Sequence, residues 1–142
     1  MIRSATSEEI PGLVDIWLRA SIRAHDFIPE AFWTSRADSM AREYLPQAEE
    51  VVVLEVEGRV IGFSALNGDH LEALFIDPKV QSYGHGSRLM AHAMAAHGRL
   101  TLCVYSRNVR AVSFYHRLGF RAVEERVEPL TGECETLMAW EH

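Results

Sequence analysis

The sequence predicts one α/β domain, in which a mixed sheet carries helices on its faces. The chain has 142 residues, which is enough for one core and too short for two. Its composition, 48% hydrophobic and 24% charged, is typical of a globular protein. Helical and strand spacings of apolar residues follow one another in the order strand, two helices, three strands, helix, strand, helix, two strands.

Four helices are expected, each bounded by residues that favour helix ends. Thr6 and Glu9 form a capping-box pattern, and Pro46 is expected to stop the second helical stretch. Asn108 and Gly119 are suited to begin and end the last helix. The helices are expected after the capping box, from Phe32 to Pro46, over residues 86–97 and over residues 108–119.

The strands are predicted by β-branched and apolar runs and by the turns between them. Glu57-Gly58-Arg59 joins two such runs as a hairpin, and Asp77-Pro78 stops the strand that follows. Thr131-Gly132 is the expected turn between the last two strands. The strands are expected at residues 2–4, twice within 49–66, and at 70–76, 99–105, 120–128 and 134–140.

The charge and the cysteines limit the possible partners and location. A formal net charge of −6 disfavours a nucleic-acid partner and suits a cationic substrate. The start of the chain lacks the apolar core of a signal peptide, and no apolar run approaches the length of a membrane span. Cys103 and Cys134 are expected to be buried free thiols in a reducing cytoplasm, with a disulfide as the alternative.

The stretch "QSYGHG", residues 81–86, lies between an expected strand and an expected helix. Glycines tolerate positive φ, and successive amides before a helix form a nest that binds anions. Ser87-Arg88 does not match the Lys-Ser or Lys-Thr of a P-loop, and Leu89 stands near where a dinucleotide fingerprint has its third glycine. The glycines alone therefore leave an anion site and a simple tight turn as equal alternatives.

A second motif follows, and together the two closely resemble the GNAT superfamily of N-acetyltransferases. The pattern is Gln81-x-x-Gly84-x-Gly86, then Asn108-x-x-Ala111-x-x-Phe114-Tyr115-x-x-x-Gly119-Phe120. The order of elements fits this family over essentially the whole chain. The segments "RASIRAHDFIP" and "EALFIDP" resemble its small, single-domain bacterial branch, called YjaB-like. The resemblance implies a mixed, mostly antiparallel sheet with about four helices, which splays between the parallel strands that flank the cofactor.

The resemblance also implies that acetyl-coenzyme A is the cosubstrate and that no metal is needed. The loop amides would bind the pyrophosphate, and the strand before the loop would pair with the pantetheine arm. Asn108 would hold that arm as well as cap its helix, while Arg88 or Lys79 would meet phosphate or remain solvated. The implied cofactor-binding residues are Leu74, Phe75, Ile76, Gln81, Ser82, Tyr83, Gly84, His85, Gly86, Ser87, Asn108 and Phe114.

Tyr115 is the residue expected to act as the general acid, because a phenol keeps its proton at neutral pH. The alternative is a core tyrosine on the apolar face of its helix. Glu72 and His70 are candidates for the base that deprotonates the amine, or else a polar lining of the acceptor groove. Strict alternation would place both on one strand face with Leu74 and Ile76.

The acceptor is expected to be a primary amine, either on a small molecule or on a protein lysine or N-terminus. His25, Asp26 and Phe27 are expected to line its site, although the segment could instead serve helix packing and capping. A homodimer is a possible state, and no nucleic-acid or membrane partner is expected. Two rivals remain: a coenzyme A-binding sensor without turnover, and an acetyltransferase of aminoacyl-tRNA, for which Arg107, Arg110, Arg117 and Arg121 would supply a basic patch.

Overall fold

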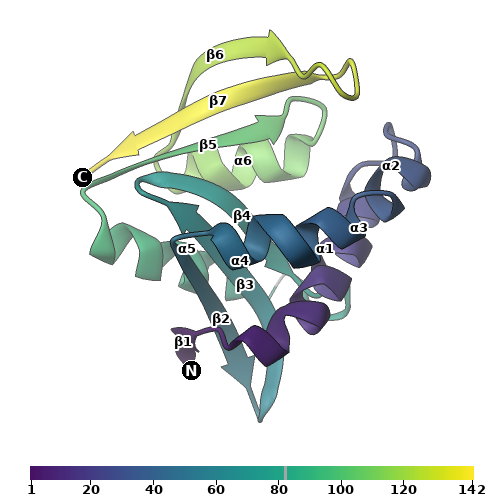
Figure 1. Ribbon diagram of the computed structural model, residues 1–142. Helices are drawn as coiled ribbons and strands as arrows, with labels where there is room; N and C mark the ends of the chain where they lie inside the picture. The colour runs from purple at the N-terminus through teal and green to yellow at the C-terminus, as the bar shows by residue number, and fades with distance from the viewer. Residues whose placement is uncertain (82) are drawn as a thin grey trace.

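The computed structural model describes residues 1–81 and 83–142 and shows a seven-stranded mixed sheet (Figure 1). Its order is β1-β2-β3-β4-β5-β7-β6, and the described pairs are antiparallel except for β4 with β5. The expected fold class is confirmed. The strands are β1 Ile2–Ser4, β2 Glu50–Val56, β3 Arg59–Asn67, β4 His70–Ile76, β5 Arg99–Tyr105, β6 Arg121–Val127 and β7 Cys134–Glu141.

The helices form four regions along the chain: α1, the stretch from α2 to α4, α5 and α6. The expected second helix is interrupted at residues 35–36 and ends at Gln47 rather than at Pro46. Residues 37–47 are helical without a break, so Pro46 lies in the last turn of this stretch, directly after the π-helical turn of residues 40–44. The bounds are η1 Ser7–Glu9, α1 Ile10–Ala24, α2 Glu30–Thr34, α3 Ala37–Ser39, the π-helical turn η2 Met40–Tyr44, α4 Leu45–Gln47, η3 Pro78–Val80, α5 His85–Ala96 and α6 Val109–Arg117.

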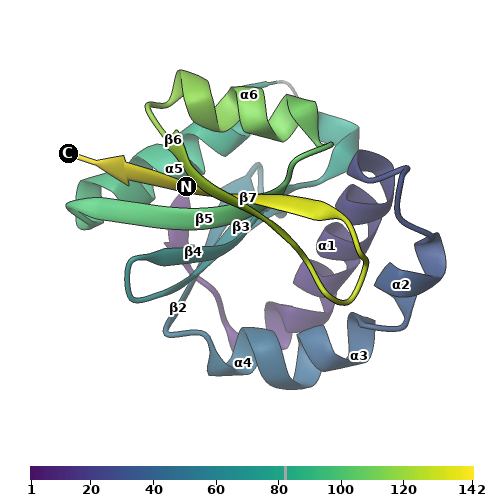
Figure 2. The ribbon, with the colours of Figure 1, turned by 90° about the horizontal axis from the view of Figure 1, so that it is seen from above.

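Helices cover both faces of the sheet, as the view from above shows (Figure 2). On one face, α1 and the α2–α4 stretch bury an apolar cluster that includes Trp17, Trp33 and Phe63. On the other face, α5 and α6 pack over a cluster that includes Met90 and Met138. Among the described helices, none has the length and apolar character needed to cross a membrane.

The two cysteines are free, as expected, but they are not buried. Cys103 is half-buried in β5, and Cys134 is exposed at the start of β7. The burial prediction was wrong for two reasons. Cys103 lies on the face of β5 opposite to that of Leu102 and Val104, and Cys134, although it shares a face of β7 with the buried Met138, stands at the exposed start of that strand. Leu102 and Val104 occupy the buried face of β5 instead.

A buried carboxylate, Asp77, fixes α1 to the end of β4. The two terminal guanidinium nitrogens of Arg19 donate to its oxygens, at 2.9 and 3.2 Å, and the amide of Lys79 donates at 3.0 Å. The Asp77 side chain is 3% exposed. The bonds from Arg19, followed by that from Lys79, lower the pKa of Asp77 from 3.8 to about 2, against an opposing effect of burial. The chain that leads into residues 81–86, called the glycine segment below, is therefore held against α1.

Asp77→Asn should cost about 2 kcal/mol of unfolding free energy at pH 7, since the lowered pKa of Asp77 stabilises the folded state above the unfolded-state pKa. That contribution is lost as pH falls through the folded pKa. The difference between wild type and variant should narrow by about 1 kcal/mol between pH 6 and pH 3 in urea unfolding. Asp38→Asn, which breaks an exposed pair with Arg42, is the control and should change little. A pH-independent difference for Asp77→Asn would contradict the prediction.

Candidate active site

The sheet opens between its two parallel strands. β4 and β5 pair at His70–Thr101 and at Leu71–Leu102, and the pairing is not continued further along the described strands. The remainder of β4, from Leu74 to Ile76, stays paired with β3 on its other edge. Its second edge therefore presents backbone N–H and C=O groups toward β5 without a strand partner. This is the splay that the sequence resemblance implied.

A cavity of about 1060 Å³ passes through this opening. On the side of α5 and α6 it is lined by the glycine segment and by the inner side of α6. On the side of α1 and α2–α4 it is lined by aromatic and acidic residues. The expected site residues that line it are His25, Glu72, Leu74, Phe75, Ile76, Gln81, Gly84, His85, Gly86, Ser87, Asn108, Phe114 and Tyr115.

Among the residues that the structure describes, four of the predicted site residues do not line this cavity. His70 lies in a smaller cleft with Arg99 and Arg121, and its Nδ1 is 2.8 Å from Thr101 Oγ1. Asp26 is exposed, and Tyr83 is exposed on the surface of the glycine segment. Phe27 packs edge-on against Tyr105 and His25, beneath the guanidinium of Arg107. The expected role of Ser82 falls outside the described residues.

Gly84 and the start of α5 have a backbone geometry that can bind an anion. Gly84 adopts φ 81° directly before α5, a helix of 12 residues, so the amides of the first turn face the cavity end. A Cβ on Gly86 would lie 3.3 Å from the ring of Phe114, so this position has little room for a side chain. Gln81 donates from Nε2 to the carbonyl of Ile76 at 3.2 Å, which ties the segment back to β4.

Asn108 connects the two sides of the cavity. Its Oδ1 accepts from the amide of Ala111 at 3.3 Å, which confirms the expected helix cap. Its Nδ2 lies 3.3 Å from Nε2 of His25, at the end of α1. The amide group that is expected to meet the cofactor arm is therefore held from two elements.

Tyr115 sits on the face of α6 that packs against the core, with its ring edge-on to Phe120 at 5.7 Å between centroids. It also lines the cavity. Burial raises the pKa of its phenol to about 12, because the surroundings disfavour the phenolate. The hydroxyl consequently stays protonated at neutral pH and can donate a proton.

Glu72 occupies a bulge in β4, and this overturns the expected alternation. Ala65 pairs with Ala73 and Leu66 pairs with Leu71, so one extra residue stands between them. Leu71 and Leu74 consequently pack on the side of α5 and α6, whereas Ala73 and Phe75 pack on the side of α1. The prediction that Glu72 shares a face with Leu74 and Ile76 was wrong. Its carboxylate accepts one bond, at 3.4 Å from Asn67 Nδ2.

The part of the cavity on the side of α1 and the α2–α4 stretch, called the far chamber below, contains residues that the sequence did not predict as site residues. The phenol of Tyr105, at the end of β5, donates to Glu128 at 3.1 Å. Glu128 also accepts from the amide of Leu130 at 2.7 Å and from Thr131. Burial acts to raise the pKa of Glu128, but these bonds together lower it. The alternation of residues along β5 could have predicted that Tyr105 lines the cavity. Glu128 lines it only because of how the chain folds, so no sequence pattern could have predicted its place.

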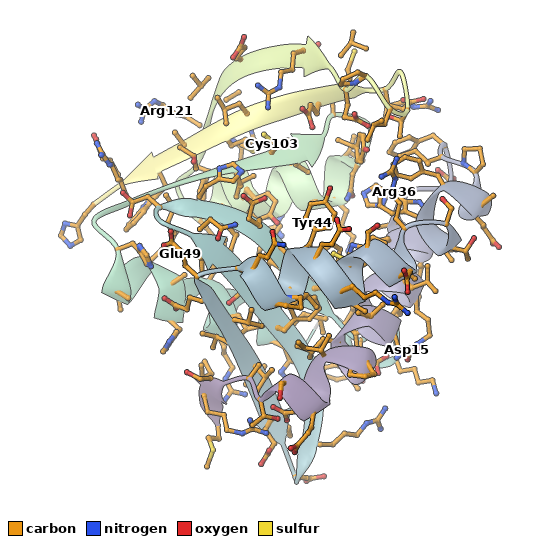
Figure 3. All side chains as sticks on the ribbon, viewed as in Figure 1. Asp15, Arg36, Tyr44, Glu49, Cys103 and Arg121 are labelled. Atoms are coloured by element: carbon orange, nitrogen blue, oxygen red, sulfur yellow. The ribbon has the colours of Figure 1, made fainter. Side chains whose placement is uncertain are left out.

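The rim of this chamber is formed by two segments that are distant in sequence. Arg36, Met40 and Tyr44 come from the α2–α4 stretch, and Leu130 comes from the turn between β6 and β7. Figure 3 shows Arg36 and Tyr44 projecting from that stretch toward the strand that carries Cys103. Tyr44 and Leu130 are large exposed side chains, and both line the cavity.

Comparison with known proteins agrees with this geometry. A family model described as an acetyltransferase (GNAT) domain matches residues 4–132. The peptidyl-lysine N-acetyltransferases YjaB of Salmonella typhimurium and of Escherichia coli are 36% and 38% identical over 120 residues, covering 84% of this chain and 82% and 81% of theirs. The peptidyl-lysine N-acetyltransferase YiaC of E. coli is 33% identical, covering 99% of this chain and 96% of its own.

Solved structures show the same fold. The solution structure of apo YjaB from E. coli superposes with a TM-score of 0.86 at 33% identity, covering 99% of this chain and 96% of that one. The PaiA N-acetyltransferase of Thermoplasma acidophilum, solved with coenzyme A, has a TM-score of 0.80 at 16% identity, covering 100% of this chain and 98% of that one. The chain therefore belongs to the GNAT family of N-acetyltransferases.

Proposed function

We propose that this N-acetyltransferase moves the acetyl group of acetyl-coenzyme A to the side-chain amine of a lysine in a protein or peptide. The observation that carries the proposal is the continuous cavity. It runs from the glycine segment, past the open edge of β4, into a chamber that contains the carboxylates of Glu72 and Glu128. The relatives named as peptidyl-lysine N-acetyltransferases support the choice of a polypeptide acceptor.

The residues on the side of α5 and α6 fit coenzyme A. The amides after Gly84, at the start of α5, would hold the pyrophosphate, and the absence of a side chain at Gly86 would let the ligand approach the main chain there. The free edge of Leu74–Ile76 offers hydrogen-bonding groups to the amides of the pantetheine arm. When bound, the cosubstrate supplies an acetyl thioester.

Two side chains suit the proton transfers. Tyr115 would donate its proton to the departing thiolate, because its raised pKa keeps the phenol protonated. Glu72 would accept the proton that the alkyl ammonium loses, directly or through a water, since its carboxylate lines the cavity and receives one long bond. Glu128 is less suited to this task because four hydrogen bonds already occupy it.

The chamber suits a lysine on a polypeptide better than a small polar amine. Trp33, Met40 and Tyr105 would contact an aliphatic stem, and the carboxylates beyond them would attract the ammonium. The exposed side chains of Tyr44 and Leu130, which come from two separate segments, give the rim apolar surface where the residues flanking the lysine would lie. The net charge of −6 adds a favourable long-range field for a basic peptide. A cytoplasmic location and a homodimer stay predictions.

The experiment is thiol release from acetyl-coenzyme A, measured with lysine peptides, small primary amines, peptides with free N-termini and aminoacyl-tRNA. Lysine peptides should raise release above the rate without acceptor, and mass spectrometry should place the acetyl group on the lysine Nζ. Binding of acetyl-coenzyme A without release for any acceptor would favour the sensor. Preferential acetylation of aminoacyl-tRNA would favour the other rival.

Tyr115→Phe should lower kcat by about 10²–10⁴-fold, because the variant removes the proton donor and keeps the ring. The dissociation constant of coenzyme A, measured by calorimetry, should remain within about twofold. Unchanged kcat would remove Tyr115 from the acid role.

Glu72→Gln should lower kcat/KM for a lysine peptide by about 10²-fold at pH 7. The deficit should shrink toward pH 10, because a lysine amine with a pKa of about 10.4 is then increasingly neutral without help. Glu43→Gln, an exposed change on the α2–α4 stretch, is the control. A loss of equal size from His70→Asn would return His70 to the base role.

Gly84→Ala should weaken coenzyme A binding about tenfold and destabilise the fold by about 1 kcal/mol, since alanine disfavours φ 81°. Gly68→Ala is the matched control. Gly68 also has a positive φ, of 58°, but it lies in the turn between β3 and β4, and a Cβ there meets nothing within 4 Å. It should show a similar loss of stability with unchanged binding. Equal effects of both variants on binding would contradict an anion site at Gly84.

A further inference from the structure

His25 is a buried histidine whose two ring nitrogens have different partners. The residue is 7% exposed, and Nδ1 lies 2.8 Å from the carbonyl oxygen of Ser21. A carbonyl oxygen accepts and does not donate, so Nδ1 carries a proton. Burial lowers the pKa of His25, which keeps the ring neutral. Nε2 is therefore an acceptor, and Asn108 Nδ2 donates to it at 3.3 Å.

This bond determines which way the amide of Asn108 points. Oδ1 accepts from the Ala111 amide while Nδ2 donates to His25. A flipped amide would place its NH₂ group against the Ala111 N–H and its oxygen against the lone pair of His25 Nε2. Both contacts would be repulsive, so one orientation is selected. An amide nitrogen carries two hydrogens, so one N–H remains for a ligand in the cavity that Asn108 lines.

Aromatic rings hold the imidazole in place from the other side. His25 stacks on Trp33 with centroids 4.9 Å apart, and it meets Phe27 and Tyr105 edge-on at 5.7 and 5.4 Å. Tyr105 is the titratable group among these rings, and its hydroxyl is bonded to Glu128. Trp33 and Tyr105 also line the far chamber, where the acceptor is proposed to bind. The imidazole thus lies between that wall and Asn108.

We propose that His25 is a positioning residue that orients Asn108 for the coenzyme A arm. It acts through Asn108 and does not contact the reacting atoms. This inference rests on the proposed function, because it requires coenzyme A to be bound beside Asn108. The sequence led us to expect that His25 lines the acceptor site; the inference gives it a different task, since both ring nitrogens already have partners within the protein.

Two substitutions separate positioning from packing. In His25→Asn the amide NH₂ can take the place of Nδ1 and donate to Ser21, but the side chain is too short to reach Asn108. In His25→Gln the longer amide can place its oxygen where Nε2 was and accept from Asn108. Both variants lose the ring and its stacking on Trp33, so the loss of packing is matched. His25→Asn should weaken coenzyme A binding about five- to tenfold in calorimetry, and His25→Gln no more than about twofold.

A double-mutant cycle with Asn108→Ala gives the second criterion. Once Asn108 is absent, His25→Asn should cause no further loss of coenzyme A affinity. Equal losses in the two His25 variants, or additive losses in the cycle, would overturn the positioning role while leaving the proposed function intact. Failure of the wild-type protein to bind coenzyme A would overturn the proposed function and this inference with it.

The wild-type protein offers a measurement that does not depend on variants that fold. Long-range ¹H–¹⁵N spectra report which imidazole nitrogen carries the proton. At pH 7 His25 should be neutral, with its proton on Nδ1. A proton on Nε2, in either the other tautomer or the imidazolium, would remove the acceptor for Asn108 and overturn the inference.

Discussion

The early end of pairing between β4 and β5 is the constraint on which the rest of the site depends. Two residue pairs join these strands, and then the edge of β4 from Leu74 onward faces a cavity. Backbone polar groups in such a place need partners, because an unpaired buried amide or carbonyl is costly. A ligand with its own amides, such as the pantetheine arm, would satisfy them in the way an added strand does. The opening also lets a molecule reach from one face of the sheet to the other.

Helix α1 organises both ends of this opening. Near its middle, Arg19 holds Asp77, which fixes the chain where it leaves β4 for the glycine segment. At its end, His25 reaches Asn108 at the start of α6. The glycine segment and the start of α6, which are expected to hold the cofactor, are therefore both anchored to α1. Because protein interiors are closely packed, a displacement of α1 would change the positions of the glycine segment and of Asn108 together.

The sequence was most informative where function depends on the main chain. Glycines at 84 and 86, and Asn108 before a helix, are local signals that predicted their elements, and the structure places them along one cavity. The side chain of Glu72 was misplaced because a bulge is a property of strand pairing, and alternation in one strand cannot reveal it. The sequence did not predict Glu128 and Leu130 as site residues for a related reason: the position of the turn that brings them to the cavity is set by the fold.

The bulge has a chemical consequence. Without the extra residue, Glu72 would point with Leu74 toward α5 and α6, on the same side as Tyr115. With it, the carboxylate lies in the chamber on the other face, near Asn67 and Cys103. A carboxylate beside the phenol of Tyr115 would accept a hydrogen bond from it, as Glu128 does from Tyr105, and both groups would then be occupied by each other instead of by the reacting molecules. With Glu72 and Tyr115 on different faces of the sheet, the amine would be deprotonated on one face and the thiolate protonated on the other. The amine and the thioester would meet in the opening between β4 and β5.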